Sequence, residues 1–325
     1  MHNDSAVALI QIKDILAARH LEAVAAAIAE SQRPSTRKAY TAAWKRFQAW
    51  AQREGVPSLP AEPVTVAAYL VHRDAVGLSL ATLAMDRKAI SYFHRRAGIP
   101  TPTASEGVKM AIAGVRNRAA ERGGPRRRQA RGLREAELKA ITDTAHIPRV
   151  YPSGRMESPG AARTRGAVDI AIVSVMRDAL LRRQEAADLR WSDVEFRADR
   201  SSRVTIRRSK TSNKSAVLYL GVRATAALKR IRPDSPIPGA RVFGVRRGRT
   251  ISARIATVCR EAGLGDGFSG HSPRVGMAQD LAAHGTGLVA IMNAGRWKSE
   301  RMPAYYSRGE AAGMGAVARY YGGIR

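Results

Sequence analysis

Apolar residues recur at helical spacing in the first part of the chain. Tyr40, Trp44, Phe47 and Trp50 follow one another at intervals of four, three and three residues, which places the four rings on one face of a helix. Ser35 lies where a side chain can cap the start of that helix. The pattern therefore predicts an amphipathic helix whose aromatic face is buried in a core.

Helical patterns continue to about residue 123. A second helix starts in the stretch 61–70, and a third can be capped by Ser79 and closed by Gly98. A fourth covers residues 108–118. The four segments together predict a small helical domain over residues 34–122.

A strongly basic stretch follows this domain. Gly123, Gly124 and Pro125 break any helix there. The stretch holds one acid, Glu121, against eight arginines, at positions 116, 118, 122, 126, 127, 128, 131 and 134. A run of this kind is normally a solvated linker, and it could also lie along the backbone of a duplex. We expect residues 123–132 to connect two domains.

The second half of the chain mixes helices with a short β segment. An opening helix is predicted over 133–141, and residues 168–181 are apolar nearly all round, as in a buried central helix. Residues 203–208 alternate between apolar and polar, a β-rich run covers 216–220, and turn residues lie between the two runs, which predicts a hairpin. A further helix is expected over 252–262. The fold class is therefore mainly α with a small β component.

A candidate anion-binding site lies toward the C-terminus. Ser272 can cap a helix there, Pro273 fits its first position, and Gly285 can end it. The start of a helix attracts anions because its free N–H groups and its dipole are positive. His271 adds a titratable group, and Arg274 adds a fork of donors that matches phosphate oxygens.

Aromatic residues follow this helix start. Trp297 comes first, and the adjacent Tyr305 and Tyr306 follow it, with Tyr306 nine residues after Trp297. Pro303 favours a helix that begins nearby. A phenol beside a histidine and arginine phosphate clamp indicates a nucleophile that attacks a phosphodiester. On a helix the two tyrosine side chains diverge by about 100°, so only one of them can face the phosphate.

The charge balance indicates a polyanionic partner. The 325 residues include 55 Lys and Arg against 27 Asp and Glu, a formal net charge of +28. DNA, a ribosome or an anionic membrane surface would match such an excess. No run of 18 or more apolar residues is present, so we expect no membrane span.

The cysteine and histidine content argues against a disulfide or a metal site. Cys259 is the single cysteine, so it can form neither an internal disulfide nor a cysteine-based zinc site. The seven histidines show no pairing at metal-ligand spacing. The first residues lack a basic segment followed by an apolar core. We therefore expect a cytoplasmic protein.

Several motifs, in their order along the chain, resemble the tyrosine recombinase (phage integrase) family, and within it the Cre-like members. G-H-S-P-R-V-G and A-G-R-W, followed by A-Y-Y, resemble the second catalytic box of that family. L-L-R-R-Q-E-A-A-D-L-R-W-S-D resembles the first box, whose pattern is L-R-x-x-E-L-x-x-L-x-W-x-D. The resemblance covers residues 34–325.

The resemblance implies a helical core-binding domain and an α/β catalytic domain that form a C-shaped clamp on DNA. It divides the chain into an N-terminal arm (1–33), the core-binding domain (34–122), the basic linker (123–132), the catalytic domain (133–310) and a C-terminal tail (311–325). In relatives such a tail docks on the neighbouring protomer.

The resemblance also implies a catalytic set, carried over position by position: Arg182, Glu185, Lys210, His271, Arg274, Trp297 and Tyr306. The two arginines would contact the nonbridging phosphate oxygens, the glutamate would orient the basic residues, and the lysine would protonate the leaving 5′-oxygen. The histidine would handle the proton of the tyrosine, against whose helix the tryptophan would pack. Arg183, Lys214 and Tyr305 remain as alternatives to Arg182, Lys210 and Tyr306.

We also expect DNA contacts from polar residues and one methionine, most of them in the first domain: Arg37, Lys38, Lys45, Thr82, Met85, Arg87, Lys88, Arg116, Arg118 and Arg254.

The implied activity is site-specific recombination. The tyrosine attacks a scissile DNA phosphate, which leaves a 3′-phosphotyrosyl link and a free 5′-hydroxyl, and the reaction needs no metal, ATP or other cofactor. The implied partner is double-stranded DNA with inverted-repeat half-sites, bound by a dimer per site and by a homotetramer in the synapse, at the nucleoid. Two alternatives remain open at this point: a type IB topoisomerase that relaxes one duplex, and a non-catalytic basic DNA-binding protein.

Overall fold

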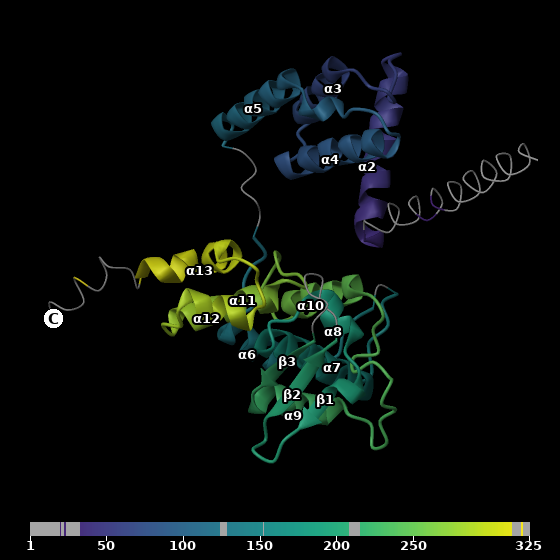
Figure 1. The fold of residues 1–325 in the computed structure, drawn as a ribbon. Coiled ribbons are helices and arrows are strands. Elements are labelled where there is room, and N and C mark those ends of the chain that lie inside the picture. Colours follow the sequence, from purple (N-terminus) through teal and green to yellow (C-terminus); the bar gives the residue numbers. More distant parts are fainter. Residues whose placement is uncertain are drawn as a thin grey trace, which may run out of the picture. The chain divides into compact units, whose positions relative to one another are not determined.

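The computed structural model describes residues 20, 23, 33–123, 129–151, 153–207, 215–313 and 320, with the backbone alone at 311–313. The chain divides into two compact units, residues 1–128 and 129–325, and the boundary falls inside the predicted basic linker (Figure 1). Within the described ranges, no helix combines the length and the apolar character that crossing a bilayer requires.

The first unit is helical. Its elements are α2 (Pro34–Arg53), α3 (Pro63–Ala75), α4 (Leu80–Arg96), the 3₁₀ turn η1 (Pro102–Ala104) and α5 (Glu106–Glu121). The predicted aromatic face of α2 is confirmed, because Trp44, Phe47 and Trp50 are buried in the core of this unit. Tyr40 is half-buried and packs on Tyr92 with ring centroids 5.3 Å apart.

The helix caps follow the sequence signals in part. The Ser79 cap is confirmed, since its Oγ accepts a hydrogen bond from the backbone N–H of Thr82 at 3.3 Å. The predicted cap at Ser35 is wrong, because α2 already begins at Pro34 and Arg33 is the residue before it. Proline has no backbone N–H. A proline at the first helical position therefore leaves no donor there to be capped, and the helix can start without a side-chain cap.

Asp86, on α4, is a fully buried carboxylate. Its Oδ1 accepts a hydrogen bond from Arg46 on α2 at 2.8 Å, and its Oδ2 accepts one from Arg73 on α3 at 3.1 Å. The hydroxyl of Tyr69 lies 3.5 Å from Oδ2. Burial, and next the charge of Asp86, raise the pKa of Tyr69 to about 12, so the phenol remains a donor. Asp86 thereby ties three helices together.

The second unit contains one sheet and eight α-helices among the described residues. The helices are α6 (Glu135–Thr144), α7 (Pro159–Asp178), α8 (Arg183–Asp188), α9 (Val222–Ile231), α10 (Gly248–Glu261), α11 (Ser272–Ala283), α12 (Leu288–Ala294) and α13 (Arg301–Gly313), with a 3₁₀ turn η2 (Trp191–Asp193). The sheet and α9 lie together on one side of this unit, while α11, α12 and α13 gather on the other (Figure 1).

Helix α7 is the central helix of the second unit. It packs on α6, α9, α10 and α11, and every residue from 171 to 177 is buried, as the apolar run predicts. The predicted boundaries of 168–181 are wrong at both ends. The helix begins at Pro159, after a cap at Ser158, because its first turns carry polar and exposed residues that the apolar pattern cannot reveal. It ends before Leu180, which has a φ of 44°.

The predicted hairpin is confirmed and gains a third strand. Strands β2 (Ser202–Ile206) and β3 (Ala216–Leu220) pair antiparallel, and Val204 and Ile206 are buried on one face. Strand β1 (Val194–Phe196) adds to β2 in the order β1-β2-β3. Its three residues are too few to show an alternation, so the sequence pattern misses it.

Helix α10 begins four residues before the predicted start at 252. The backbone N–H of Gly248 donates to Gln184 Oε1 at 3.0 Å, so a side chain from α8 satisfies a free donor at the start of α10. Such a partner, distant in the sequence, leaves no local cap signal.

We expect Asp86→Ala to lower the free energy of unfolding of the full chain by about 3 kcal/mol, because it leaves a partly buried arginine and a buried phenol without their acceptor. A denaturant titration measures this change. Glu106→Ala is the control: Glu106 pairs with Lys109 on the surface and is 75% exposed, so its loss should cost less than about 1 kcal/mol. Equal effects of the two substitutions would contradict the importance of Asp86.

Candidate active site

Arg182 and Glu185 meet at the start of α8. Arg182 is the residue before the helix, and its backbone N–H donates to Glu185 Oε2 at 2.9 Å. Its side chain donates from Nη1 to Glu185 Oε1 at 2.8 Å. The carboxylate is buried, so it holds the arginine at both its backbone and its guanidinium. Arg183, the alternative to Arg182, is exposed.

His271 and Tyr306 form a direct contact. His271 Nε2 lies 2.8 Å from the hydroxyl oxygen of Tyr306, which comes from α13 and is buried. The two rings are 5.5 Å apart and tilted by 65°. Tyr305 is half-buried, and its ring lies 4.7 Å from the guanidinium carbon of Arg308. Of the two adjacent tyrosines, Tyr306 is therefore the one that reaches the predicted histidine.

The predicted cap of α11 is corrected by one residue. His271 precedes the helix, and Ser272 is its first residue instead of its cap. The Ser272 hydroxyl is buried and accepts a hydrogen bond from the backbone N–H of Ser269 at 2.9 Å. This contact tightens the turn that presents His271. The predicted end of the helix is confirmed, since Gly285 follows α11 with a φ of 79°.

Arg274 is almost completely buried, with 1% of its surface exposed. Its Nη1 donates to the carbonyl oxygen of Leu180, and its Nη2 donates to that of Gly295. Its guanidinium carbon lies 4.0 Å from the centre of the Trp297 ring, a cation–π contact. Burial, with the positive charges of Arg182 and Arg296, lowers the pKa of Arg274 to about 9. No carboxylate contacts it directly among the described residues, so its charge is held by dipoles and a π face.

The same positive field acts on the histidine. Burial, together with the charges of Arg274, Arg182 and Arg183, lowers the pKa of His271 to about 4. The imidazole is therefore neutral at pH 7, and one of its nitrogens can accept a proton. A neutral imidazole beside a phenol is the arrangement that general-base activation of a hydroxyl nucleophile needs.

Trp297 joins the arginine to the tyrosine. Besides Arg274, its ring contacts Tyr306 at 5.9 Å between centroids, so it packs against α13 as predicted. Gly295 makes this position possible: a Cβ there would lie 1.8 Å from an atom of the Trp297 ring. The glycine of the A-G-R-W motif is thus a steric requirement of the site.

Arg296 is a residue of the site that the sequence pattern did not single out. Its Nη2 donates to Glu185 Oε2 at 2.8 Å, and the side chain is 15% exposed. Burial lowers its pKa, against the opposing effect of Glu185. Its position inside A-G-R-W, directly before Trp297, was the only available signal. Nothing in the motif shows that this arginine turns toward the first catalytic box.

Helix α13 is tied to the rest of the second unit near the site. Arg134 donates from Nε to Asp280 on α11 at 2.7 Å and from Nη1 to Glu310 on α13 at 3.0 Å. Arg177 of α7 also pairs with Asp280, at 2.7 Å. These ion pairs fix the helix that carries Tyr306 against the helix that follows His271.

Lys210 and its alternative Lys214 lie outside the described residues. Strand β2 ends at Ile206, and strand β3 begins at Ala216. Among the described residues, no group of three or more His, Cys, Asp or Glu side chains could hold a metal ion.

Five of the residues predicted to contact DNA in the first unit line two basic grooves. Arg37, Lys38 and Lys45 of α2 line one, to which Arg96 of α4 also contributes. Arg87 and Lys88 of α4 line the other, with Arg95 and Lys109. Thr82 is bound to the Ser79 cap, and Met85 is 37% exposed on the same helix.

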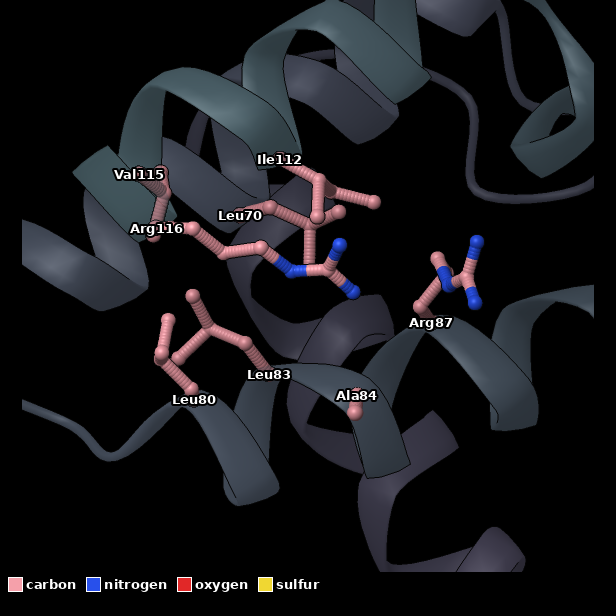
Figure 2. Close-up of a pocket in the computed structure, with 8 residues that line it drawn as sticks. All are labelled: Leu70, Leu80, Leu83, Ala84, Arg87, Ile112, Val115 and Arg116. Atoms are coloured by element: carbon pink, nitrogen blue, oxygen red, sulfur yellow. The ribbon is translucent and has the colours of Figure 1, made fainter. Parts of the chain in front are cut away.

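The two predicted contacts on α5, Arg116 and Arg118, have different surroundings in the structure. Arg116 and Arg87 reach over a small cavity whose other walls are Leu70, Leu80, Leu83, Ala84, Ile112 and Val115 (Figure 2). Arg118 pairs with the buried Asp74 at 3.5 Å.

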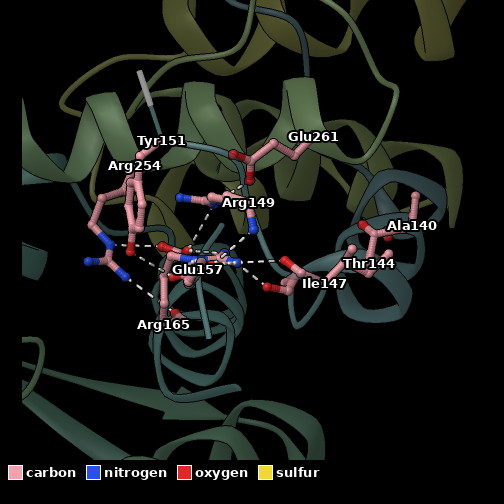
Figure 3. A network of polar contacts seen from close by, with 11 residues as sticks. Ala140, Thr144, Ile147, Arg149, Tyr151, Glu157, Arg165, Arg254 and Glu261 are labelled. Atoms are coloured by element: carbon pink, nitrogen blue, oxygen red, sulfur yellow. Dashed lines mark hydrogen bonds and ion pairs between the residues drawn. The ribbon is translucent and has the colours of Figure 1, made fainter. Parts of the chain in front are cut away.

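Arg254, on α10, takes part in an ion network of the second unit (Figure 3). Its Nε donates to Asp169 Oδ1 at 2.8 Å, and its Nη2 donates to the carbonyl oxygen of Arg165 at 3.3 Å. Arg165 in turn contacts the buried Glu157 at 2.9 Å. Arg254 is thus held by a carboxylate, and a DNA contact from it remains a prediction.

Comparisons with known proteins identify the family of the chain. The model of the Phage integrase family matches residues 131–312, more than half of the chain. Recombinase cre of Escherichia phage P1 is 25% identical over 304 residues, which cover 85% of this chain and 84% of that protein. An integrase/recombinase xerD homolog of Selenomonas ruminantium is 26% identical over 316 residues, 90% of this chain and 87% of that protein.

The fold also has counterparts among solved structures. A lambda integrase (75–356) dimer bound to a COC' core site superposes with a TM-score of 0.55 at 18% identity, over 92% of this chain and 93% of that one. This likeness supports a core-binding domain and a catalytic domain of the same fold. With the matched family model and the two recombinase relatives, it leads to one conclusion: the chain belongs to the phage integrase family, whose members are tyrosine recombinases.

Proposed function

We propose that this site-specific tyrosine recombinase cleaves DNA by attack of the Tyr306 hydroxyl on a scissile phosphate. The observation that carries the assignment is the 2.8 Å contact between Tyr306 and His271 Nε2, beside two buried or half-buried arginines. The attack forms a bond from Tyr306 to phosphorus and breaks the bond to the 5′-oxygen. The products are a 3′-phosphotyrosyl link and a free 5′-hydroxyl.

His271 is the proposed general base for this attack. Its low pKa keeps the imidazole neutral at pH 7, so Nε2 can take the phenolic proton as the tyrosine oxygen bonds to phosphorus. In the reverse step, protonated His271 returns the proton to Tyr306 when a 5′-hydroxyl attacks the phosphotyrosyl link. The bond energy is kept in that link, so strand exchange needs no external energy source.

Arg274 and Arg182 are the proposed clamp for the phosphate. Negative charge grows on the nonbridging oxygens in the pentacoordinate transition state, and fixed guanidinium donors stabilise it without reorganisation. Arg274 is held by two carbonyl groups and Arg182 by Glu185, so both are preorganised. Arg183 is exposed, whereas Arg182 is half-buried and held by Glu185, and this difference favours Arg182 for the role.

Lys210 is proposed to protonate the leaving 5′-oxygen, a role that rests on the motif register alone. Lys is suited to it because the ε-ammonium group is a mobile donor on a flexible stem. Trp297 supports the clamp by packing against both Arg274 and Tyr306.

Double-stranded DNA is the proposed substrate, and the basic grooves of the first unit are its proposed contact surface. Lysine and arginine side chains that line a concave surface release counterions from the phosphate backbone when they bind it. We further propose a dimer on each site with inverted-repeat half-sites, a homotetramer in the synapse and a location at the nucleoid. The dimer of lambda integrase on its core site supports the first of these. Family membership favours strand exchange over the topoisomerase and non-catalytic alternatives.

The tyrosine assignment predicts opposite results for two variants. Tyr306→Phe should bind DNA normally and form no covalent adduct, because it lacks the attacking oxygen. Tyr305→Phe should still form one. The measurement uses a nicked duplex built on a sequence selected by the full chain from a random library, followed by a denaturing gel. A covalent band from Tyr306→Phe that is missing from Tyr305→Phe would reverse the assignment.

The buried neutral His271 predicts a pH-dependent stability. Its folded pKa of about 4 lies below its ordinary value of 6.5, so the unfolded chain binds the extra proton first as pH falls. The free energy of unfolding should drop through pH 6.5 to 4, by an amount of order 3 kcal/mol from this group. In His271→Gln the drop should be smaller by that amount. Tyr306→Phe, which keeps the imidazole, serves as the control, and parallel curves for all three proteins would refute the assignment.

The groove assignment predicts a change in the salt dependence of DNA binding. The slope of log K against log salt is negative. Lys45→Ala should make it less steep by about 1, as expected for one lost phosphate contact. Lys139→Ala is the matched control, because Lys139 is exposed on α6 and pairs with Asp143. Binding is measured by fluorescence anisotropy of the selected duplex. The same slope for Lys45→Ala and the wild type would exclude Lys45 from the DNA surface.

A further inference from the structure

Arg296 has an unusual backbone conformation for an arginine. Its φ is 55°, in the left-handed region, and only Leu180 and Arg200 share this property among the described residues other than glycine. A side chain other than glycine avoids this region because its Cβ crowds the following carbonyl group. Such a conformation persists where surrounding contacts determine it, and these positions cluster at functional sites.

The side chain of Arg296 contacts the first catalytic box, at Glu185. Its Nη2 donates to Glu185 Oε2 at 2.8 Å and lies 3.4 Å from the carbonyl oxygen of Leu180. Its Nε and Nη1 are buried and have no hydrogen-bond partner within the described residues. Buried donors without acceptors are costly, so packing alone does not account for an arginine at this position.

The backbone of Arg296 contacts the same site. Arg182 Nη2 donates to the carbonyl oxygen of Arg296 at 3.3 Å, while Arg182 Nη1 donates to Glu185 Oε1. Glu185 therefore lies between two guanidinium groups, with Oε1 toward Arg182 and Oε2 toward Arg296. One end of the Arg182 fork is held by Glu185, and the other end is held by Arg296 itself.

The left-handed turn also serves Arg274. The carbonyl group of Gly295, directly before Arg296, accepts a hydrogen bond from Arg274 Nη2. The carbonyl group of Leu180, which is also left-handed, accepts from Arg274 Nη1 and from Arg296 Nη2. The two left-handed residues thus each supply one backbone acceptor to the phosphate clamp, Leu180 to Arg274 and Arg296 to Arg182.

We propose that Arg296 is a positioning residue of the catalytic site. Its guanidinium holds the Glu185 carboxylate, and its carbonyl oxygen holds Arg182, so that the Arg182 fork keeps one orientation toward the phosphate. The three guanidinium groups with one carboxylate leave a net charge of two positive units, which suits a transition state with two negative nonbridging oxygens. This inference rests on the proposed function and adds a residue to its machinery.

The experiment compares single-turnover cleavage of the selected nicked duplex by the wild type and five variants. Arg296→Met removes the charge and keeps a long side chain with the same backbone preference, and Arg296→Lys keeps the charge without the fork. Glu185→Gln and the double variant Glu185→Gln/Arg296→Met complete a double-mutant cycle. Arg200→Met is the control: Arg200 is also left-handed, with a φ of 64°, but it is exposed in the turn before β2.

Arg296→Met should cleave about 10- to 100-fold more slowly, the range that a misplaced catalytic group costs, while its Kd for the duplex stays within about twofold of the wild type. Arg296→Lys should recover part of the rate. If Arg296 acts through Glu185, the double variant should cleave about as slowly as Glu185→Gln alone. Arg200→Met should cleave at the wild-type rate.

Three results would overturn the inference. Wild-type cleavage by Arg296→Met would exclude a positioning role, and multiplicative losses in the double variant would show that Arg296 acts independently of Glu185. Arg296→Met could also lose thermal stability and affinity for the duplex together. If Arg296→Lys recovered neither, the role of Arg296 would be purely structural. Failure of the proposed function is distinct, because then the wild type and Arg200→Met form no adduct either.

Discussion

The candidate site depends on a positive charge that is buried with no carboxylate in direct contact among the residues that the structure describes. Arg274 is 1% exposed, and its donors are satisfied by the carbonyl groups of Leu180 and Gly295 and by the face of Trp297. Dipoles compensate a charge less well than water or a carboxylate does, which is why the pKa of Arg274 falls. In the proposed mechanism, a phosphate bound at this site supplies the missing negative charge, so substrate binding offsets part of the cost of burying Arg274.

The same field sets the protonation state of His271, the proposed base. His271 lies among Arg274, Arg182 and Arg183, and their charges and its burial disfavour the imidazolium form. A site that attracts phosphate by positive charge therefore keeps its histidine neutral without a separate device. The two halves of the proposed mechanism, a phosphate clamp and a base for Tyr306, follow from one electrostatic arrangement.

The surrounding ion pairs keep this arrangement in place. Asp280 on α11 accepts from Arg134 and Arg177, and Arg134 also reaches Glu310 on α13. The proposed nucleophile, Tyr306, and the proposed base, His271, lie on different elements. These contacts link the helices beside them through α7 and the segment before α6. Removal of the Asp280 carboxylate would therefore affect the position of Tyr306, although none of these ion pairs joins Asp280 directly to the tyrosine.

The sequence by itself determined the elements and residue types that depend on neighbours along the chain. The aromatic face of α2, the Ser79 cap, the β2–β3 hairpin and the end of α11 at Gly285 follow from local periodicity and backbone preference. The motif register likewise brought forward His271, Arg274 and Tyr306, because their spacing is itself the signal. Only the tertiary structure decided that Arg296 contacts Glu185, 111 residues earlier in the chain, and that Gln184 opens α10 at Gly248. Those contacts depend on how distant segments pack, and a local pattern carries no information about the partner that a buried charge will meet.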